Sequence, residues 1–246
     1  MKAIVAAGIS AALLLAASPS AAQVTYGARP AAASDADALG DPALKAPAVL
    51  AFMGVRPGWR IADLFAGKFT RAFSQAVGAK GKVYAIEFAQ LVKAHPAALT
   101  RANAVASRAI NGNVEVQTPP IDAPALPANL DAVFIRQNYH DLHDKWTGPA
   151  DVGLFNRNVY AALKPGGIFV IIDHAAAAGT GLRDTDTLHR IDPAAVKAEV
   201  TAAGFVFDGS SDALANPADD HTKAVFDPSI RGRTDQFIYR FRKPKA

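Results

Sequence analysis

Histidine, tyrosine and acidic residues that could carry out chemistry follow two apolar segments of the chain. The segment NYHDLHD, residues 138–144, follows the apolar run DAVFI after two polar residues, and the pair Asp173-His174 ends the segment IFVIIDH. Histidine titrates near neutral pH and can act as a general base on a substrate hydroxyl or amine. Four residues are therefore predicted to form a catalytic group: Tyr139, His140, Asp173 and His174.

The same segment has a metal-binding and a structural alternative. His140 and His143 are three residues apart and have Asp141 and Asp144 beside them. Two histidines with nearby carboxylates suit Zn²⁺ or a similar ion, but Asp and His near a helix start also cap that helix. The spacing does not separate these alternatives, and we assign no metal ligand from the sequence. His189 is expected to pack or cap, and residues 175–185 form a loop long enough to act as a lid.

Two further acidic residues, Asp63 and Glu87, lie in the stretch GWRIADLFAGKFTRAFSQAVGAKGKVYAIE, residues 58–87. The stretch is typical of a strand, a turn, a helix, a second turn and a strand that ends in Glu87, which is the outline of a nucleotide-type cofactor site. Such turns need glycines so that the backbone can take positive φ and a ligand can approach. The turn from Asp63 to Phe69 has one, Gly67, and Phe65 and Phe69 would crowd the approach. The alternative is a vestigial turn that only buries a strand end.

Apolar strands alternate with amphipathic helices through most of the chain, which predicts right-handed crossovers and a largely parallel sheet. Gly54 and Gly78 are predicted to end helices, Pro96 to interrupt one, and Asp192 to cap another. Segments 216–223 are expected to form an exposed loop between the last two strands. The expected strands lie at 60–65, 82–88, 114–119, 131–136, 168–174, 205–214 and 234–243.

The length of 246 residues, of which 50% are hydrophobic, fits one domain after removal of a leader. Residues 1–22 are typical of a signal peptide, with Lys2, an apolar centre and a small-residue cleavage site after Ala22. A retained N-terminal anchor is the alternative. Residues 23–45 are interpreted as an N-terminal arm and residues 46–246 as the domain. The predicted location is periplasmic or secreted, with no stable membrane insertion after cleavage. Zero cysteines exclude thiol chemistry, and the scattered basic residues argue against nucleic acid as a partner.

The chain resembles class I S-adenosylmethionine-dependent methyltransferases. The resemblance rests on the first strand ending at Asp63, on Glu87 closing the second strand, and on the segment ALKPGGIFVIIDH. The chain further resembles an exported branch of predicted methyltransferases in the phrases QNYHDLH and GLRDTDTLHRIDPAAVKAEVTAAGF. Its turn after Asp63 is shorter and poorer in glycine than the pattern of that branch.

This resemblance implies a Rossmann-like α/β fold, with a seven-stranded, mostly parallel sheet, an antiparallel last strand and helices on both faces. It also implies transfer of a methyl group from S-adenosylmethionine to a small-molecule substrate. Asp122 is similar to the residue that meets the adenine amino group, and a turn-capping role is its alternative. Two other functions remain open: an exported binding protein with a degenerate fold, and a metal-dependent hydrolase or lyase that uses the HDLHD segment. The residues assigned to the cofactor are Asp63, Phe65, Gly67, Glu87, Asp122 and Asn138.

Overall fold

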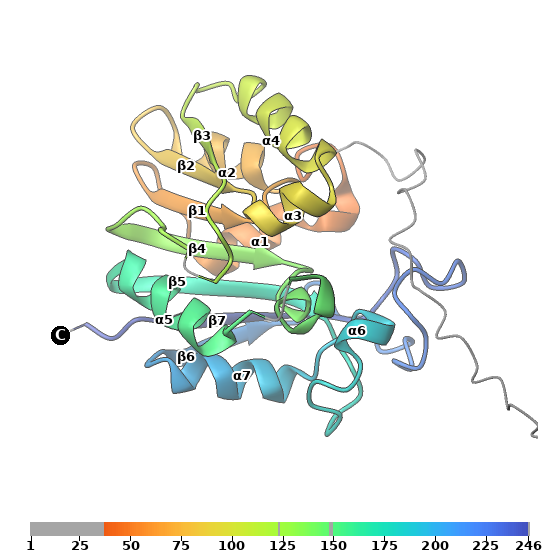
Figure 1. Cartoon of the computed structure of the whole chain (residues 1–246). Helices are drawn as coiled ribbons and strands as arrows, with labels where there is room; N and C mark the ends of the chain where they lie inside the picture. Colours follow the sequence, from red (N-terminus) through yellow and green to blue (C-terminus); the bar gives the residue numbers. More distant parts are fainter. Residues whose placement is uncertain (1–36, 123, 148–149, 246) are drawn as a thin grey trace, which may run out of the picture. The chain divides into compact units, whose positions relative to one another are not determined.

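A seven-stranded sheet runs through the part of the chain that the structure, a computed structural model, describes: residues 37–122, 124–147 and 150–245. The strand order is β3-β2-β1-β4-β5-β7-β6, and Figure 1 shows these strands side by side. Strands β1 to β5 are parallel to one another, whereas β7 is antiparallel to both of its neighbours, β5 and β6. The predicted mostly parallel sheet with an antiparallel last strand is confirmed. The strands are β1 (Arg60–Leu64), β2 (Lys82–Ile86), β3 (Val114–Gln117), β4 (Leu130–Arg136), β5 (Leu163–His174), β6 (Val206–Ser211) and β7 (Gln236–Arg242).

Helices cover both faces of the sheet, because apolar side chains leave each strand on both sides. One buried cluster joins the sheet to α5 and α7 through residues such as Phe155 and Val196. The other joins the opposite face to α1 and α2 through residues such as Val49 and Phe73. The helices are α1 (Ala46–Met53), α2 (Thr70–Val77), α3 (Ala89–Ala94), α4 (Ala97–Ser107), α5 (Val152–Ala162), α6 (Thr185–Leu188) and α7 (Pro193–Ala202), with 3-10 turns η1 (Pro42–Leu44), η2 (His140–His143) and η3 (Lys145–Thr147).

The helix ends follow the predicted signals. Gly54 ends α1 with a left-handed φ of 70°, and Gly78 follows the last residue of α2. Pro96 separates α3 from α4, since proline cannot donate the hydrogen bond that would continue a helix. The Asp192 side chain caps α7 by accepting a hydrogen bond from the Ala194 amide at 2.8 Å. These local signals therefore determine where the helices begin and end.

Strand β5 is longer than expected, because it begins at Leu163 instead of at residue 168. The segment Lys-Pro-Gly-Gly passes into the strand, with a register irregularity opposite Leu130 and Ala132. A side chain at Gly167 would meet the Lys164 carbonyl oxygen at 2.9 Å, so this position requires glycine. The predicted helix-to-strand connection is thus part of the strand itself.

The predicted signal peptide, residues 1–22, and most of the predicted arm lie outside the described residues. The described end of the arm, residues 37–45, packs on the domain: Ala38 and Leu44 are buried, and Asp37 pairs with Arg71 of α2 at 2.8 Å. Across the described ranges, no helix combines the length and the apolar character that a membrane crossing requires.

Candidate functional site

The sequence-predicted residues gather at the carboxyl edge of the parallel strands. Asp63 lies in β1 and Glu87 follows β2, which pairs with it. The segment 138–144 follows β4, and Asp173 and His174 end the neighbouring β5. Ligands of open α/β sheets bind at this edge. The edge holds two groups of residues, one beyond β1 and β2 and one beyond β4 and β5.

The turn after β1 is organised by Asp63 and Thr70. The Thr70 hydroxyl donates to Asp63 Oδ2 at 2.6 Å and accepts from the Gly67 amide at 3.1 Å. Asp63 is buried, and this burial raises the pKa of its carboxyl to about 7, against the lowering effect of the hydrogen bond from Thr70. Asp63 thus holds the turn and the start of α2 in place, and Thr70 is a residue that sequence reasoning missed.

The two phenylalanines of this turn have different positions. The Phe69 ring is buried against Phe73 and Phe134 on the α1/α2 face of the sheet. Phe65 remains at the turn, where its ring packs edge-on against Phe88 with a centroid distance of 4.9 Å. Its φ is 50°, a left-handed conformation that costs energy in a bulky residue. Phe69 therefore leaves the approach clear, and Phe65 takes the backbone conformation for which glycine is better suited.

Glu87 is a buried acid with an unsatisfied oxygen. The whole residue is 3% exposed, and its Oε2 atom has no hydrogen-bond partner among the residues that the structure describes. Burial, and then the nearby charge of Asp63, raise the pKa of Glu87 to about 8. A Cβ added at Gly67 would meet no atom within 4 Å, so the turn leaves open space at its one glycine. A buried acceptor and an open glycine fit a ligand that brings hydroxyl groups, such as a ribose.

The two remaining residues assigned to the cofactor have polar partners of their own. Asp122 is exposed and accepts a hydrogen bond from Gln90 Nε2 at 3.3 Å, while Gln90 Oε1 accepts from the Ile121 amide. Asn138 is half-buried and donates to Asp141 Oδ2 at 2.5 Å, which ties it to the group beyond β4. Their cofactor roles stay predictions.

The predicted catalytic pair His140 and Asp173 forms a buried hydrogen-bonded unit. Asp173 accepts from the His140 and His174 amides, and its Oδ1 lies 2.8 Å from His140 Nδ1. Burial opposes a charge on His140, but the carboxylates of Asp173 and Asp141 outweigh it and raise the pKa of the imidazole to about 9. His174 faces Thr234 Oγ1 at 2.8 Å, and burial holds its pKa well below the usual value. Without a bound cation, His140 is thus protonated at neutral pH, whereas His174 is neutral.

Tyr139 lies in the core and connects two helices to the sheet. Its hydroxyl donates to Glu199 of α7 at 3.0 Å and accepts from Asn156 of α5 at 2.7 Å. The side chain is fully buried, and burial together with the charge of Glu199 raises its pKa well above 10. His143 contacts the same Glu199 oxygen at 3.2 Å. These contacts favour a packing role for Tyr139, and Glu199 was not singled out in the sequence because nothing local relates α7 to residue 139.

His189 joins this group from outside the predicted set. It ends α6 with a left-handed φ of 53°, which agrees with the expected capping position. Its Nδ1 nevertheless lies 3.3 Å from His140 Nε2, and 3.9 Å and 3.8 Å from carboxylate oxygens of Asp141 and Asp144. Four buried side chains therefore converge: His140, Asp141, Asp144 and His189.

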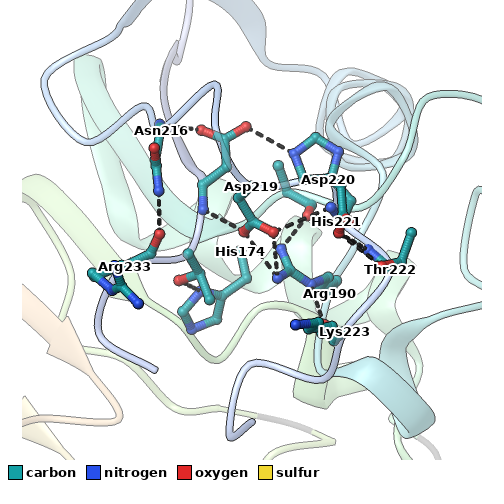
Figure 2. A network of polar contacts seen from close by, with 12 residues as sticks. His174, Arg190, Asn216, Asp219, Asp220, His221, Thr222, Lys223 and Arg233 are labelled. Atoms are coloured by element: carbon teal, nitrogen blue, oxygen red, sulfur yellow. Dashed lines mark hydrogen bonds and ion pairs between the residues drawn. The ribbon is translucent and has the colours of Figure 1, made fainter. Parts of the chain in front are cut away.

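A buried ion pair between Arg190 and Asp219 belongs to a second polar network, which Figure 2 shows together with His174. Arg190 is fully buried and pairs with Asp219 at 2.9 Å, while its other nitrogens donate to the carbonyls of Ala175 and Lys223. Asp219 also accepts from the Asp235 amide at 2.7 Å. The loop 216–223, expected to be exposed, is thus anchored at Asp219, although Asp220 and Thr222 beside it are exposed.

The predicted lid, residues 175–185, is also held to the domain by hydrogen bonds. Gly179 and Gly181 donate their amides to the Asp192 carboxylate at 2.8 Å and 3.3 Å, and Ala175 forms a bridge with Ile191. The same aspartate caps α7, so residues 175–192 form a closed loop on the end of β5.

The strand order and the antiparallel β7 define this chain as having the class I methyltransferase fold. Among solved structures it is similar to the [4+2]-cyclase SpnF, at 17% identity over 83% of this chain and 81% of the other, with a TM-score of 0.61. It is similar to an S-adenosylmethionine-dependent methyltransferase from Aquifex aeolicus, at 20% identity over 83% and 95% of the two chains, with a TM-score of 0.55. A third, from Mesorhizobium loti, shares 20% identity over 80% and 96%, with a TM-score of 0.54. At these identities the likeness establishes the fold. No protein-family model and no curated protein matches the chain.

Proposed function

We propose that this chain binds S-adenosylmethionine beyond β1 and β2 and transfers its methyl group to a small molecule. The observation that carries the proposal is Glu87, a buried carboxylate at the end of β2 with an oxygen that accepts no hydrogen bond from the described residues. A buried unsatisfied acceptor costs free energy unless a ligand pairs with it. The hydroxyls of a ribose would do so, and the two S-adenosylmethionine-dependent methyltransferases reported above share the fold.

The cofactor would supply an electrophilic methyl group, and the chain's own residues bind and orient. Glu87 accepts ribose hydroxyls, and Gly67 leaves the backbone open where a side chain would intrude. Asp63 keeps the turn closed on α2 through Thr70. Methyl transfer depends chiefly on holding nucleophile and methyl in line, so this arrangement needs no strong acid or base at the reacting atoms.

A calorimetric titration with S-adenosylhomocysteine tests the proposal. Glu87→Gln keeps the size of the side chain and replaces one acceptor oxygen with an amide donor, so the affinity should fall by about 5- to 150-fold, as for a buried hydrogen-bonding group left unsatisfied at a cost of about 1–3 kcal/mol. Glu115→Gln is the matched control, because Glu115 is an exposed acid on the neighbouring strand β3. No heat from the wild-type chain at millimolar ligand, or equal affinity in Glu87→Gln, would contradict the proposal.

A second candidate function is binding or catalysis without methyl transfer. It is favoured by the left-handed Phe65 in the one-glycine turn and by the fold shared with a [4+2]-cyclase. Incubation with methyl-labelled S-adenosylmethionine and a small-molecule extract distinguishes the two. Ligand binding without any labelled product would favour this second candidate.

We also propose that residues 1–22 direct export, with cleavage after Ala22. The support is the sequence pattern of a positive start, an apolar centre and small residues before the cleavage site. Amino-terminal sequencing of the protein from a periplasmic fraction tests this, and a mature chain that begins at Met1 would contradict it.

A further inference from the structure

We propose that His140, Asp141, Asp144 and His189 form a binding site for a divalent transition-metal ion, with Zn²⁺ as the best match. The four side chains are buried, and one ligand atom from each lies within 4.8 Å of all the others. This site is separate from the residues proposed to bind S-adenosylmethionine, and the inference does not depend on methyl transfer.

The distances between the ligand atoms suit tetrahedral coordination. Bonds of about 2.0–2.2 Å to nitrogen and oxygen place neighbouring ligand atoms about 3.4 Å apart around a tetrahedral ion. His140 Nε2 lies 3.3 Å from His189 Nδ1 and 3.4 Å from Asp141 Oδ1. His189 Nδ1 lies 3.9 Å and 3.8 Å from Asp141 Oδ1 and Asp144 Oδ2. A cation at the centre would contact two imidazole nitrogens and two carboxylate oxygens.

The Asp144 carboxylate supports a bound cation independently of the distances between the ligand atoms. Its side chain is 1% exposed, and neither carboxylate oxygen has a hydrogen-bond partner in the described part of the chain. A buried carboxylate without a hydrogen bond is costly, and the His189 nitrogen at 3.8 Å is too far away to donate one, whereas coordination to a cation satisfies the carboxylate. Asp144 Oδ2 is the oxygen that faces His189.

Partners outside the four ligands orient two of them. His140 Nδ1 donates to Asp173 at 2.8 Å, because a carboxylate only accepts, and this leaves the Nε2 lone pair directed at the cluster. Asn138 donates to Asp141 Oδ2 at 2.5 Å, and the other oxygen, Oδ1, is the one that lies 3.4 Å from His140 Nε2 and 3.9 Å from His189 Nδ1. A carboxylate on the far nitrogen of a metal-bound histidine is the common outer-shell arrangement in metal sites.

The charges of the cluster also favour a divalent ion. Asp141 and Asp144 supply two negative charges, which the ion balances when both histidines are neutral. Asp173 is stabilised separately by hydrogen bonds from the His140 ring and from the amides of His140 and His174. The bound ion would connect η2, which follows β4, to the end of α6, which follows β5.

The ligand set differs from the pair that the sequence suggested. His140 and His143 are three residues apart, but His143 contacts Glu199 at 3.2 Å and is not among the four. His189 takes the place of His143. His143→Gln is therefore a matched control, since it removes a histidine of the same turn without removing a ligand.

Zinc titration of the chelator-treated full-length chain tests the proposal, with bound metal counted by mass spectrometry. We expect one Zn²⁺ per chain and a melting temperature that rises with Zn²⁺. Asp173→Asn removes a partner outside the four ligands and should weaken Zn²⁺ binding by about 10- to 100-fold. Asp144→Asn and His189→Gln each remove a ligand and should weaken Zn²⁺ binding by more than that. His143→Gln should bind as the wild type does.

Cobalt provides a readout that needs no variant. Co²⁺ added to the wild-type chain should give the visible absorption of a tetrahedral site, and Zn²⁺ should abolish it. Absence of saturable binding by the folded wild-type chain overturns the proposal and leaves a metal-free ion-pair cluster. Binding that survives both Asp144→Asn and His189→Gln, or that is lost equally in His143→Gln, overturns it as well.

Discussion

Replacing Phe65 with glycine or alanine tests the backbone of the turn after β1. Both substitutions remove the ring that packs against Phe88 at 4.9 Å, so this loss is common to the two variants. They differ in the Cβ atom, which glycine lacks. Phe65 has a φ of 50°, and a Cβ in this left-handed region costs about 1–2 kcal/mol.

The expected difference is the Cβ cost less the entropy that glycine loses on folding. On an ordinary backbone, glycine is less stabilising than alanine by about 0.5–1 kcal/mol. Here the relief of about 1–2 kcal/mol is larger than that loss at mid-range, so Phe65→Gly should be more stable than Phe65→Ala by about 0.7 kcal/mol, within a range of about 0–1.5 kcal/mol. Alanine is usually more stable than glycine at the same position, so a more stable glycine variant at residue 65 is the informative result.

Equilibrium unfolding in urea measures this difference as a shift of the midpoint at constant slope. Phe52→Gly and Phe52→Ala provide the control, because Phe52 lies inside α1, where alanine should be the more stable by about 1 kcal/mol. A Phe65→Ala chain at least as stable as Phe65→Gly would refute the left-handed turn and the argument about cofactor approach that rests on it.

Three further predictions concern the turn, the buried acids and the buried ion pair. Gly67→Ala should raise the free energy of unfolding by about 0.4–1 kcal/mol, because its Cβ meets open space and alanine loses less entropy than glycine on folding, yet it should weaken S-adenosylhomocysteine binding by about tenfold, or about 1.4 kcal/mol. Burial raises the pKa of Asp63 to about 7 and that of Glu87 to about 8, so the folded chain holds more protons than the unfolded chain. Their contribution to stability is complete below about pH 4 and is lost as the pH rises through about 7 and 8; the free energy of unfolding should fall over this window, and less steeply in Glu87→Gln. Arg190→Met should cost about 3–5 kcal/mol of unfolding free energy, because it leaves Asp219 buried without its cation.

Each of these has a control or a contradicting outcome. A lower unfolding midpoint for Gly67→Ala than for the wild type would contradict the open space at residue 67. Urea midpoints that rise from about pH 5 to about pH 9 would contradict the raised pKa values of the two acids. Arg183→Met is the control for Arg190, because the ion pair of Arg183 with Asp184 is on an exposed side chain and should contribute little to stability. Equal costs for the two arginine variants would show that burial of the pair does not matter.

Local patterns in the sequence were sufficient for the elements and their order. The helix ends at Gly54 and Gly78, the cap at Asp192 and the break at Pro96 depend on a few neighbouring residues, and they lie where expected. The apolar runs of the central strands made a sheet covered on both faces predictable. The start of β5 at Leu163 was missed, because the pairing of Leu163 with Leu130 of β4 extends the strand beyond its apolar run.

The candidate site was predictable only in part. The ends of parallel strands meet at one edge, so the sequence alone brought Asp63 near Glu87 and the segment after β4 near Asp173. Which side chains then point at one another depends on packing between segments far apart in the chain. Tertiary contacts directed His143 to Glu199, placed His189 beside His140, buried Asp219 against Arg190, and turned Phe69 to the opposite face from Phe65. Hydrophobic periodicity encodes which residues are buried, but a polar side chain finds its partner only when the folded backbone brings the two within hydrogen-bond distance.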